Sequence, residues 1–140
     1  MRRWSLASPA RHVDRDGMES TTTQAPIILT PEAISALPLT PLGTLGGVVH
    51  RVLWRNESSM AGLLTVEAGQ RLGEHTHRFN HHHLWVLEGR ATIVGAELGP
   101  GSYVHIPSGV NHDIDATATA GCMVFYLYLR HPDEDARADG

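Results

Sequence analysis

Histidine is the residue type in this sequence best suited to chemistry, and its distribution is uneven. The chain of 140 residues contains ten histidines, five of them between positions 75 and 83. The clustered residues are His75, His77, His81, His82 and His83, and His112 follows beyond a proline turn. Neutral imidazole is the commonest protein ligand of divalent transition metals. The clustering therefore favours a metal site over a solvated histidine-rich loop.

The spacing within the cluster strengthens this interpretation. His75 and His77 form a His-x-His pair. Side chains two residues apart on a β-strand point to the same face, so both imidazoles can chelate one ion. The metal that suits such ligands is iron, zinc or nickel, with manganese as a further option.

The elements that must position these side chains are short strands. From Gly46 onward, apolar runs alternate with turn residues: GVVHRVLW, AGLLTVEAG, HHHLWVLEG, ATIVGAEL, SYVHIP and CMVFYLYLR. Turns recur roughly every 8 to 12 residues, a rhythm typical of a sandwich or jelly-roll barrel that leaves no place for crossover helices. We expect an all-β antiparallel barrel of about six to ten strands between Gly46 and Arg130.

The rest of the chain divides into three segments. Residues 1–24 carry no hydrophobic period and are expected to be a disordered extension, with Met18 as an alternative start to Met1. In residues 25–45, Thr30 as N-cap and Pro31 at the first helical position predict one short helix. Residues 131–140 are expected to be a mobile acidic tail.

Composition excludes several classes of function. With 41% hydrophobic and 19% charged residues and a net charge of -4, the sequence suits one soluble, cytoplasmic domain. It contains no basic stripe for nucleic acid and no apolar run of membrane-spanning length. Nucleotide-binding loops and serine-nucleophile motifs are absent. The single cysteine, Cys122, is expected to be a buried, inert thiol.

Two stretches, residues 69–89 and 101–112, resemble the two motifs of the cupin superfamily. The matching positions are Gly69, His75, His77, His82 and Gly89 in the first motif, and Gly101, Pro107, Gly109 and His112 in the second. His82 stands where the family has glutamate, and Ala116 stands where it has asparagine. The resemblance implies a jelly-roll barrel and four metal ligands, His75, His77, His82 and His112.

His81 is the rival of His82 for the third ligand position. Spacing favours His82, which precedes Gly89 by the seven residues that separate glutamate from glycine in the cupin motif. His83 should then point to the opposite face of its strand. A structural or surface role is expected for His105, and His12, His50 and His131 have no assigned role.

A narrower resemblance covers about residues 47 to 130. It is to the cupin domain of zinc-dependent anti-sigma factors and of acetylacetone-cleaving dioxygenases. In the anti-sigma factors a zinc-binding helical module grips the sigma factor, and we expect no such module here. The resemblance implies an enzyme acting on a small enolisable substrate, by dioxygenase-type cleavage or oxidation. Alternatives are a redox-neutral zinc or nickel cyclase, isomerase or lyase, as in four-histidine polyketide cyclases, and a non-catalytic metal or small-molecule sensor.

A fourth imidazole in place of glutamate has consequences for the chemistry. The site keeps the full charge of its metal and loses a carboxylate that could act as a base. Catalytic residues stay unassigned, with these candidates for the base: Glu67, Glu74, Glu88, Asp113, Asp115, Tyr103, Tyr126 and Tyr128. An apolar pocket wall is expected from Trp54, Trp85, Phe125 and Met123. A homodimer is also expected, with Pro26 to Leu29 covering a neighbour's sheet.

Overall fold

The computed structural model describes residues 12–13, 19–20 and 25–130. Strands β1 (His12–Val13) and β2 (Glu19–Ser20) pair antiparallel in a sheet of their own. Apart from these strands, the extension predicted over residues 1–24 lies outside the described residues, as does the tail predicted over residues 131–140.

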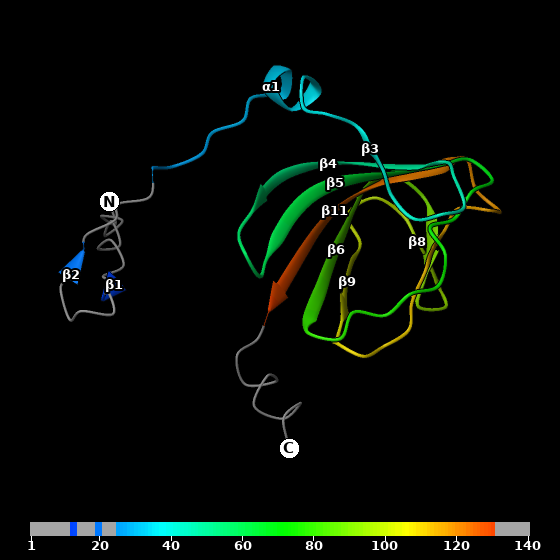
Figure 1. The fold of residues 1–140 in the computed structure, drawn as a ribbon. Coiled ribbons are helices and arrows are strands. Elements are labelled where there is room, and N and C mark those ends of the chain that lie inside the picture. Colours follow the sequence, from blue (N-terminus) through cyan, green and yellow to red (C-terminus); the bar gives the residue numbers. More distant parts are fainter. Residues whose placement is uncertain (1–11, 14–18, 21–24, 131–140) are drawn as a thin grey trace, which may run out of the picture.

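The predicted short helix is confirmed as α1 (Pro31–Ser35). The hydroxyl oxygen of Thr30 accepts a hydrogen bond from the Ala33 backbone N–H at 3.2 Å, which satisfies one of the N–H groups left free at a helix start. The Arg51 guanidinium donates to the carbonyl oxygens of Ser35 and Leu37 at 3.4 and 3.3 Å. This contact ties the end of the helix to the barrel, above which α1 lies in Figure 1.

Two antiparallel sheets build the barrel. The larger contains, in spatial order, β3 (Thr40–Pro41), β4 (Val48–Arg55), β5 (Met60–Glu67), β11 (Gly121–Arg130), β6 (Asn80–Gly89) and β9 (Tyr103–Ile106). The smaller contains β10 (Ile114–Asp115), β7 (Ala91–Ile93) and β8 (Ala96–Leu98). The eight strands from β4 to β11 fall between residues 46 and 130, which confirms the predicted antiparallel barrel.

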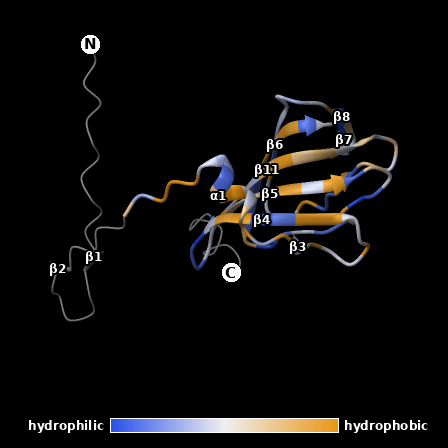
Figure 2. Ribbon diagram, turned by 90° about the horizontal axis from the view of Figure 1, so that it is seen from above, coloured by the Kyte–Doolittle hydropathy of each residue, from blue (hydrophilic) through white to orange (hydrophobic). Residues whose placement is uncertain are grey.

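Alternation along the strands separates a packed interior from an outer face. On β6, His82, Leu84 and Val86 are buried, whereas the residues between them are partly exposed. Strands β4, β5 and β11 lie side by side and are largely apolar (Figure 2). Leu84, Ile114 and Val124, each 0% exposed, bring both sheets into one core. Cys122 is buried, as predicted, and burial raises the pKa of its thiol.

Gly89, at the end of β6, is expected to be one of the least replaceable turn residues. Its φ is +72°, and a Cβ there would run into the carbonyl oxygen of Gly121. Gly95 has a similar φ of +75° with no atom within 4 Å of an added Cβ. We expect Gly95→Ala to lower the free energy of unfolding by about 1 kcal/mol. Gly89→Ala should cost several kcal/mol, because backbone must also move. Urea denaturation measures both, and equal losses would contradict the steric argument.

Candidate metal centre

Backbone pairing brings three of the predicted ligands together. His75 precedes β6 and His112 follows β9, and their backbones form a two-way antiparallel bridge with two N–H···O bonds of 2.9 Å. The carbonyl oxygen of His77 accepts a hydrogen bond from the N–H of Gly109 at 2.8 Å. This bond is a further link between the segment that precedes β6 and the segment that follows β9. As a result, one ring nitrogen from each of His75, His77 and His112 lies within 4.8 Å of the others.

Two of these imidazoles are oriented by backbone carbonyls. His75 Nδ1 lies 2.7 Å from the carbonyl oxygen of Gly73, and His112 Nδ1 lies 2.9 Å from that of Val110. A carbonyl oxygen can only accept, so each Nδ1 carries the proton and each Nε2 keeps its lone pair. Asp113 supports this arrangement by accepting the N–H of Gly73 at 2.8 Å. Carbonyl-bonded imidazoles of this kind are usual among metal-ligating histidines.

His82, buried on β6, lies next to the group formed by His75, His77 and His112. It is 1% exposed, its Nδ1 lies 3.1 Å from His112 Nε2, and its ring stacks on Tyr128 with centroids 4.0 Å apart. The Nε2 atoms of His77 and His82 are buried without any hydrogen-bond partner among the described residues. Buried polar atoms are rarely left unpaired, so a divalent metal fits this cluster of imidazole donors.

The structure places the other clustered histidines on the outer face of β6. His81 Nδ1 lies 3.2 Å from His105 Nε2, and His83 Nδ1 lies 2.6 Å from the hydroxyl of Tyr103. His83 and His105 are partners in the β6–β9 register. His82 thus shares the interior with the three-histidine group, and His81 does not.

Burial keeps the interior imidazoles neutral. Desolvation, followed by the fields of His75 and His112, lowers the pKa of His77 to about 4. Desolvation, followed by the neighbouring imidazoles, lowers the pKa of His82 to about 2. Burial also lowers the pKa of His112. Near neutral pH these lone pairs are therefore available to a metal rather than occupied by protons.

Acid should consequently destabilise the metal-free protein. Both folded-state pKa values lie below 6.5, the ordinary value for histidine, so well above pH 6.5 neither state is protonated at these sites. As the pH falls below 6.5, the unfolded chain takes up protons that the folded chain excludes. The free energy of unfolding should drop between pH 6.5 and 4 by about 1.4 kcal/mol per pH unit for each histidine.

Urea denaturation of the metal-free protein at pH 7, 6 and 5 measures this slope. His77→Ala removes one of the groups with a lowered pKa, so the slope of that variant should be shallower by about 1.4 kcal/mol per pH unit. A stability that stays constant from pH 7 to 5, or an unchanged slope in the variant, would contradict the argument.

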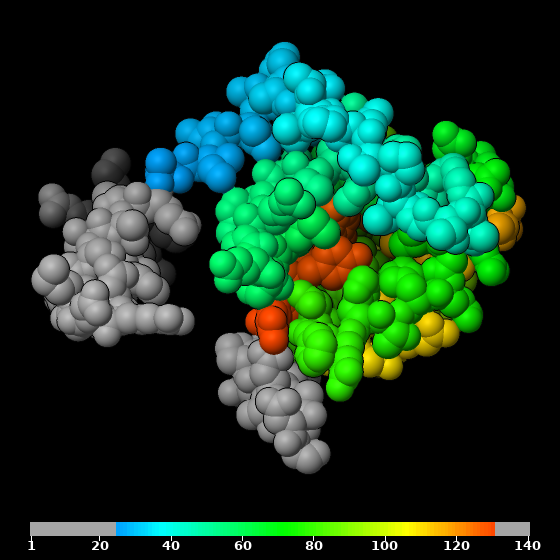
Figure 3. All heavy atoms as spheres, viewed as in Figure 1, coloured from blue at the N-terminus to red at the C-terminus, as the bar shows by residue number. Residues whose placement is uncertain are grey.

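A cavity of about 420 Å³ opens beside the cluster. His77 lines it together with His50, Tyr126 and Tyr128, and Arg55 and Glu57 lie at its exposed edge. Atoms of β11 are visible at the bottom of the hollow (orange in Figure 3). The cavity thus gives a small molecule access to the histidine cluster.

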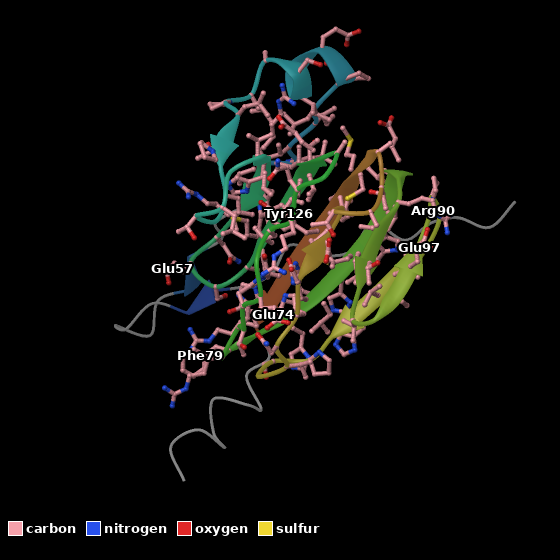
Figure 4. The ribbon with its side chains drawn as sticks, turned by 90° about the vertical axis from the view of Figure 1, so that its right-hand side faces the viewer. Glu57, Glu74, Phe79, Arg90, Glu97 and Tyr126 are labelled. Atoms are coloured by element: carbon pink, nitrogen blue, oxygen red, sulfur yellow. The ribbon has the colours of Figure 1, made fainter. Side chains whose placement is uncertain are left out.

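The structure sorts the candidates for a base. Of the candidate bases, only Tyr126 and Tyr128 line the cavity, and Tyr126 lies inside the barrel (Figure 4). Asp115 accepts the backbone N–H and the hydroxyl of Thr117, and Asp113 is engaged with the Gly73 loop. The remaining candidates are exposed: Glu67, Glu74, Glu88 and Tyr103.

The prediction that four apolar residues form a wall of the pocket is wrong. None of Trp54, Trp85, Phe125 and Met123 lines this cavity. Trp85 packs on Phe125 and Tyr103, with ring centroids 5.5 and 5.0 Å apart. The cause is the two-residue alternation, which turns Trp85 outward when His82 and Leu84 face inward.

His50 is a functional candidate that the sequence analysis left unassigned. Its Nδ1 lies 2.7 Å from the hydroxyl oxygen of Tyr126, although the two residues are 76 positions apart. A histidine in the alternating strand run GVVHRVLW, with Val48 and Val52 on the same face, was the available signal that it points inward.

Comparison with known families agrees with this architecture. A family model described as the ChrR cupin-like domain matches residues 27–131. The chain belongs to the ChrR cupin-like family. No curated protein matches the sequence. No helix in the described part of this cupin is long and apolar enough to cross a membrane.

Several solved structures share the fold. A predicted oxalate decarboxylase from Thermotoga maritima is 15% identical with a TM-score of 0.66, covering 75% of this cupin and 100% of that chain. The polyketide cyclase RemF from Streptomyces resistomycificus is 18% identical with a TM-score of 0.62, covering 79% and 83%.

A third similar structure is that of Rhodobacter sphaeroides SigE in complex with the anti-sigma ChrR. It is 22% identical with a TM-score of 0.56, and the match covers 67% of this cupin and 49% of that chain. At these identities the three likenesses establish the fold and leave the reaction open.

Proposed function

We propose that this cupin is a metal-dependent enzyme acting on a small enolisable compound, with one divalent metal held by His75, His77, His82 and His112. The observation that carries the proposal is the cluster of converging imidazoles beside a cavity of small-molecule size, with the Nε2 atoms of His77 and His82 buried and without a hydrogen-bond partner among the described residues. A bound iron, zinc or nickel ion would act as a Lewis acid that polarises a carbonyl oxygen.

The protein's own residues would orient and enclose the substrate. His77 is the only member of the predicted quartet that lines the cavity, so substrate oxygen would approach from its side. Leu42 and Met60 give that cavity apolar surface, while Arg55 and Glu57 leave its edge without net charge. The choice of substrate would therefore depend on the polar groups inside the cavity rather than on the charged residues at its edge.

Two reaction types remain for the same site. An all-imidazole donor set cancels none of the charge of the metal, which favours redox-neutral cyclisation, isomerisation or lyase chemistry. Dioxygenase-type cleavage needs iron and oxygen, and imidazole ligands suit iron as well. A non-catalytic sensor would bind the same compounds without converting them.

The experiment loads the metal-free protein separately with Fe²⁺, Zn²⁺ and Ni²⁺ and supplies β-dicarbonyl and phenolic compounds under air and under nitrogen. Conversion with zinc or nickel under nitrogen supports the redox-neutral enzyme, and conversion restricted to iron under air supports the dioxygenase. His77→Ala should be inactive in either case. Binding of the compounds without conversion under any condition would overturn the enzyme proposal in favour of the sensor.

We also propose that the protein is a homodimer. Ile27 and Ile28 are 64% and 85% exposed, in a segment that extends beside an apolar surface containing Leu53 and Trp54. Solvation of such residues is unfavourable, and a second copy could cover them. Sedimentation at micromolar concentration should show a dimer for the natural chain and a monomer for Ile28→Glu. A monomeric natural chain would contradict the proposal.

A further inference from the structure

A second polar group faces the cavity and is not part of the histidine cluster. Tyr126 of β11 is 1% exposed, and its hydroxyl oxygen lies 2.7 Å from Nδ1 of His50 on β4, which is 9% exposed. Both residues line the same cavity as His77. Burying a hydroxyl and an imidazole is unfavourable unless they are paired, and here they pair with each other.

The sheet provides space for this pair at a specific position. Strand β5 lies between β4 and β11, so the side chain of Tyr126 on β11 must extend across β5 to reach His50 on β4. Its register partner on β5 is Gly62, and a Cβ there would run into the Tyr126 hydroxyl. Gly62 is not among the glycines with positive φ, so its backbone does not require glycine. Glycine inside a strand costs stability and marks close approach, and here the approaching groups are the Tyr126 hydroxyl and the carbonyl oxygen of Arg51.

The pair is neutral near pH 7. Burial raises the pKa of Tyr126 to about 12, so the phenol keeps its proton. Burial lowers the pKa of His50, so its imidazole is uncharged. If His50 Nδ1–H donates to the phenol oxygen, the phenol proton is left to donate to an atom in the cavity. Such a donor favours an anionic oxygen over a neutral one.

We propose that the Tyr126 hydroxyl, held by His50, is the hydrogen-bond donor that selects substrates presenting two oxygen atoms, one toward the histidine cluster and one toward Tyr126. The chemical class is a small enolate, such as that of a β-dicarbonyl compound. This inference rests on the proposed function, because it assigns a substrate-binding role within the same cavity. His50 acts through Tyr126 and is a positioning residue.

The test uses Co²⁺-loaded full-length protein and two probes, followed by the visible spectrum of cobalt. Acetylacetone offers two oxygen atoms, and azide offers one donor atom. Tyr126→Phe should weaken acetylacetone binding about tenfold, in line with loss of one hydrogen bond to a charged acceptor, and leave azide and cobalt affinity unchanged. Tyr103→Phe makes the same chemical change on the outer face of the large sheet, where the Tyr103 hydroxyl contacts His83, and should alter acetylacetone binding less than about twofold.

Variants of His50 separate positioning from packing. His50→Leu should lose acetylacetone affinity as Tyr126→Phe does, and His50→Asn, which keeps a polar atom near the position of Nδ1, should recover most of it. Equal acetylacetone affinity in Tyr126→Phe and the natural protein would overturn the inference, as would a parallel loss of azide binding or an equal loss in Tyr103→Phe. Failure of the natural protein to take up cobalt would overturn the proposed function along with it, whereas the other outcomes leave that function standing.

Discussion

His77→Ala is expected to remove the metal while leaving the barrel folded. The His77 Nε2 atom is buried without a hydrogen-bond partner among the described residues, and the imidazole lines the cavity, so the side chain is available as a ligand. His77 is not part of the apolar core, so its loss should leave the barrel folded. Ligands share one binding free energy, so loss of one should weaken metal affinity at least about a hundredfold. Competition with a chromophoric chelator measures the affinity, and circular dichroism with urea denaturation measures folding.

His105→Ala provides the matched control. His105 contacts His81 and His83 on the outer face of the large sheet, away from the interior group. Metal affinity in this variant should equal that of the natural protein. If His105→Ala lost the metal and His77→Ala retained it, the ion would lie on the outer face and the assignment of the site would be wrong.

The second large effect is expected for His82→Glu in the metal-free protein. His82 is 1% exposed among imidazole and tyrosine rings, so a carboxylate there would be buried without an opposite charge. An unpaired buried charge costs about 3–5 kcal/mol, and a metal at the neighbouring histidines would supply the missing opposite charge. Urea denaturation should therefore show a strongly destabilised metal-free variant whose stability recovers when zinc is added.

His81→Glu distinguishes the two registers of the histidine run. His81 lies on the outer face beside His105, where a carboxylate has access to water. This variant should change the free energy of unfolding by less than about 0.5 kcal/mol and leave zinc affinity unaltered. A silent His82→Glu together with a metal-dependent His81→Glu would show that His81, rather than His82, is the ligand.

The fold and the position of the cluster were accessible from sequence because they rest on short-range patterns. The alternation around Leu84 and Val86, and the turns that follow Glu67 and Glu88, report strands and turns without knowledge of their partners. The same alternation, counted onward from His82, also places Trp85 on the outer face. The error about the pocket wall arose because apolar residues that point inward were not distinguished from those that point outward.

The rest depends on contacts between distant parts of the chain. The pairing of His50 with Tyr126 requires that β5 separate β4 from β11 and that its residue at that level be Gly62. No local pattern specifies that order of strands. Likewise, the bonds from His75 and His112 to carbonyl oxygens depend on how two loops bridge, which is a property of the folded backbone.

Metal stoichiometry combined with X-ray absorption tests the central claim most directly. Protein purified without chelators should carry about one divalent transition metal ion per chain, surrounded by nitrogen ligands at about 2.0–2.1 Å in the case of zinc. A triple alanine variant of His75, His77 and His112 should carry none. Natural protein without metal after reconstitution, or an ion retained in the triple variant, would contradict the account.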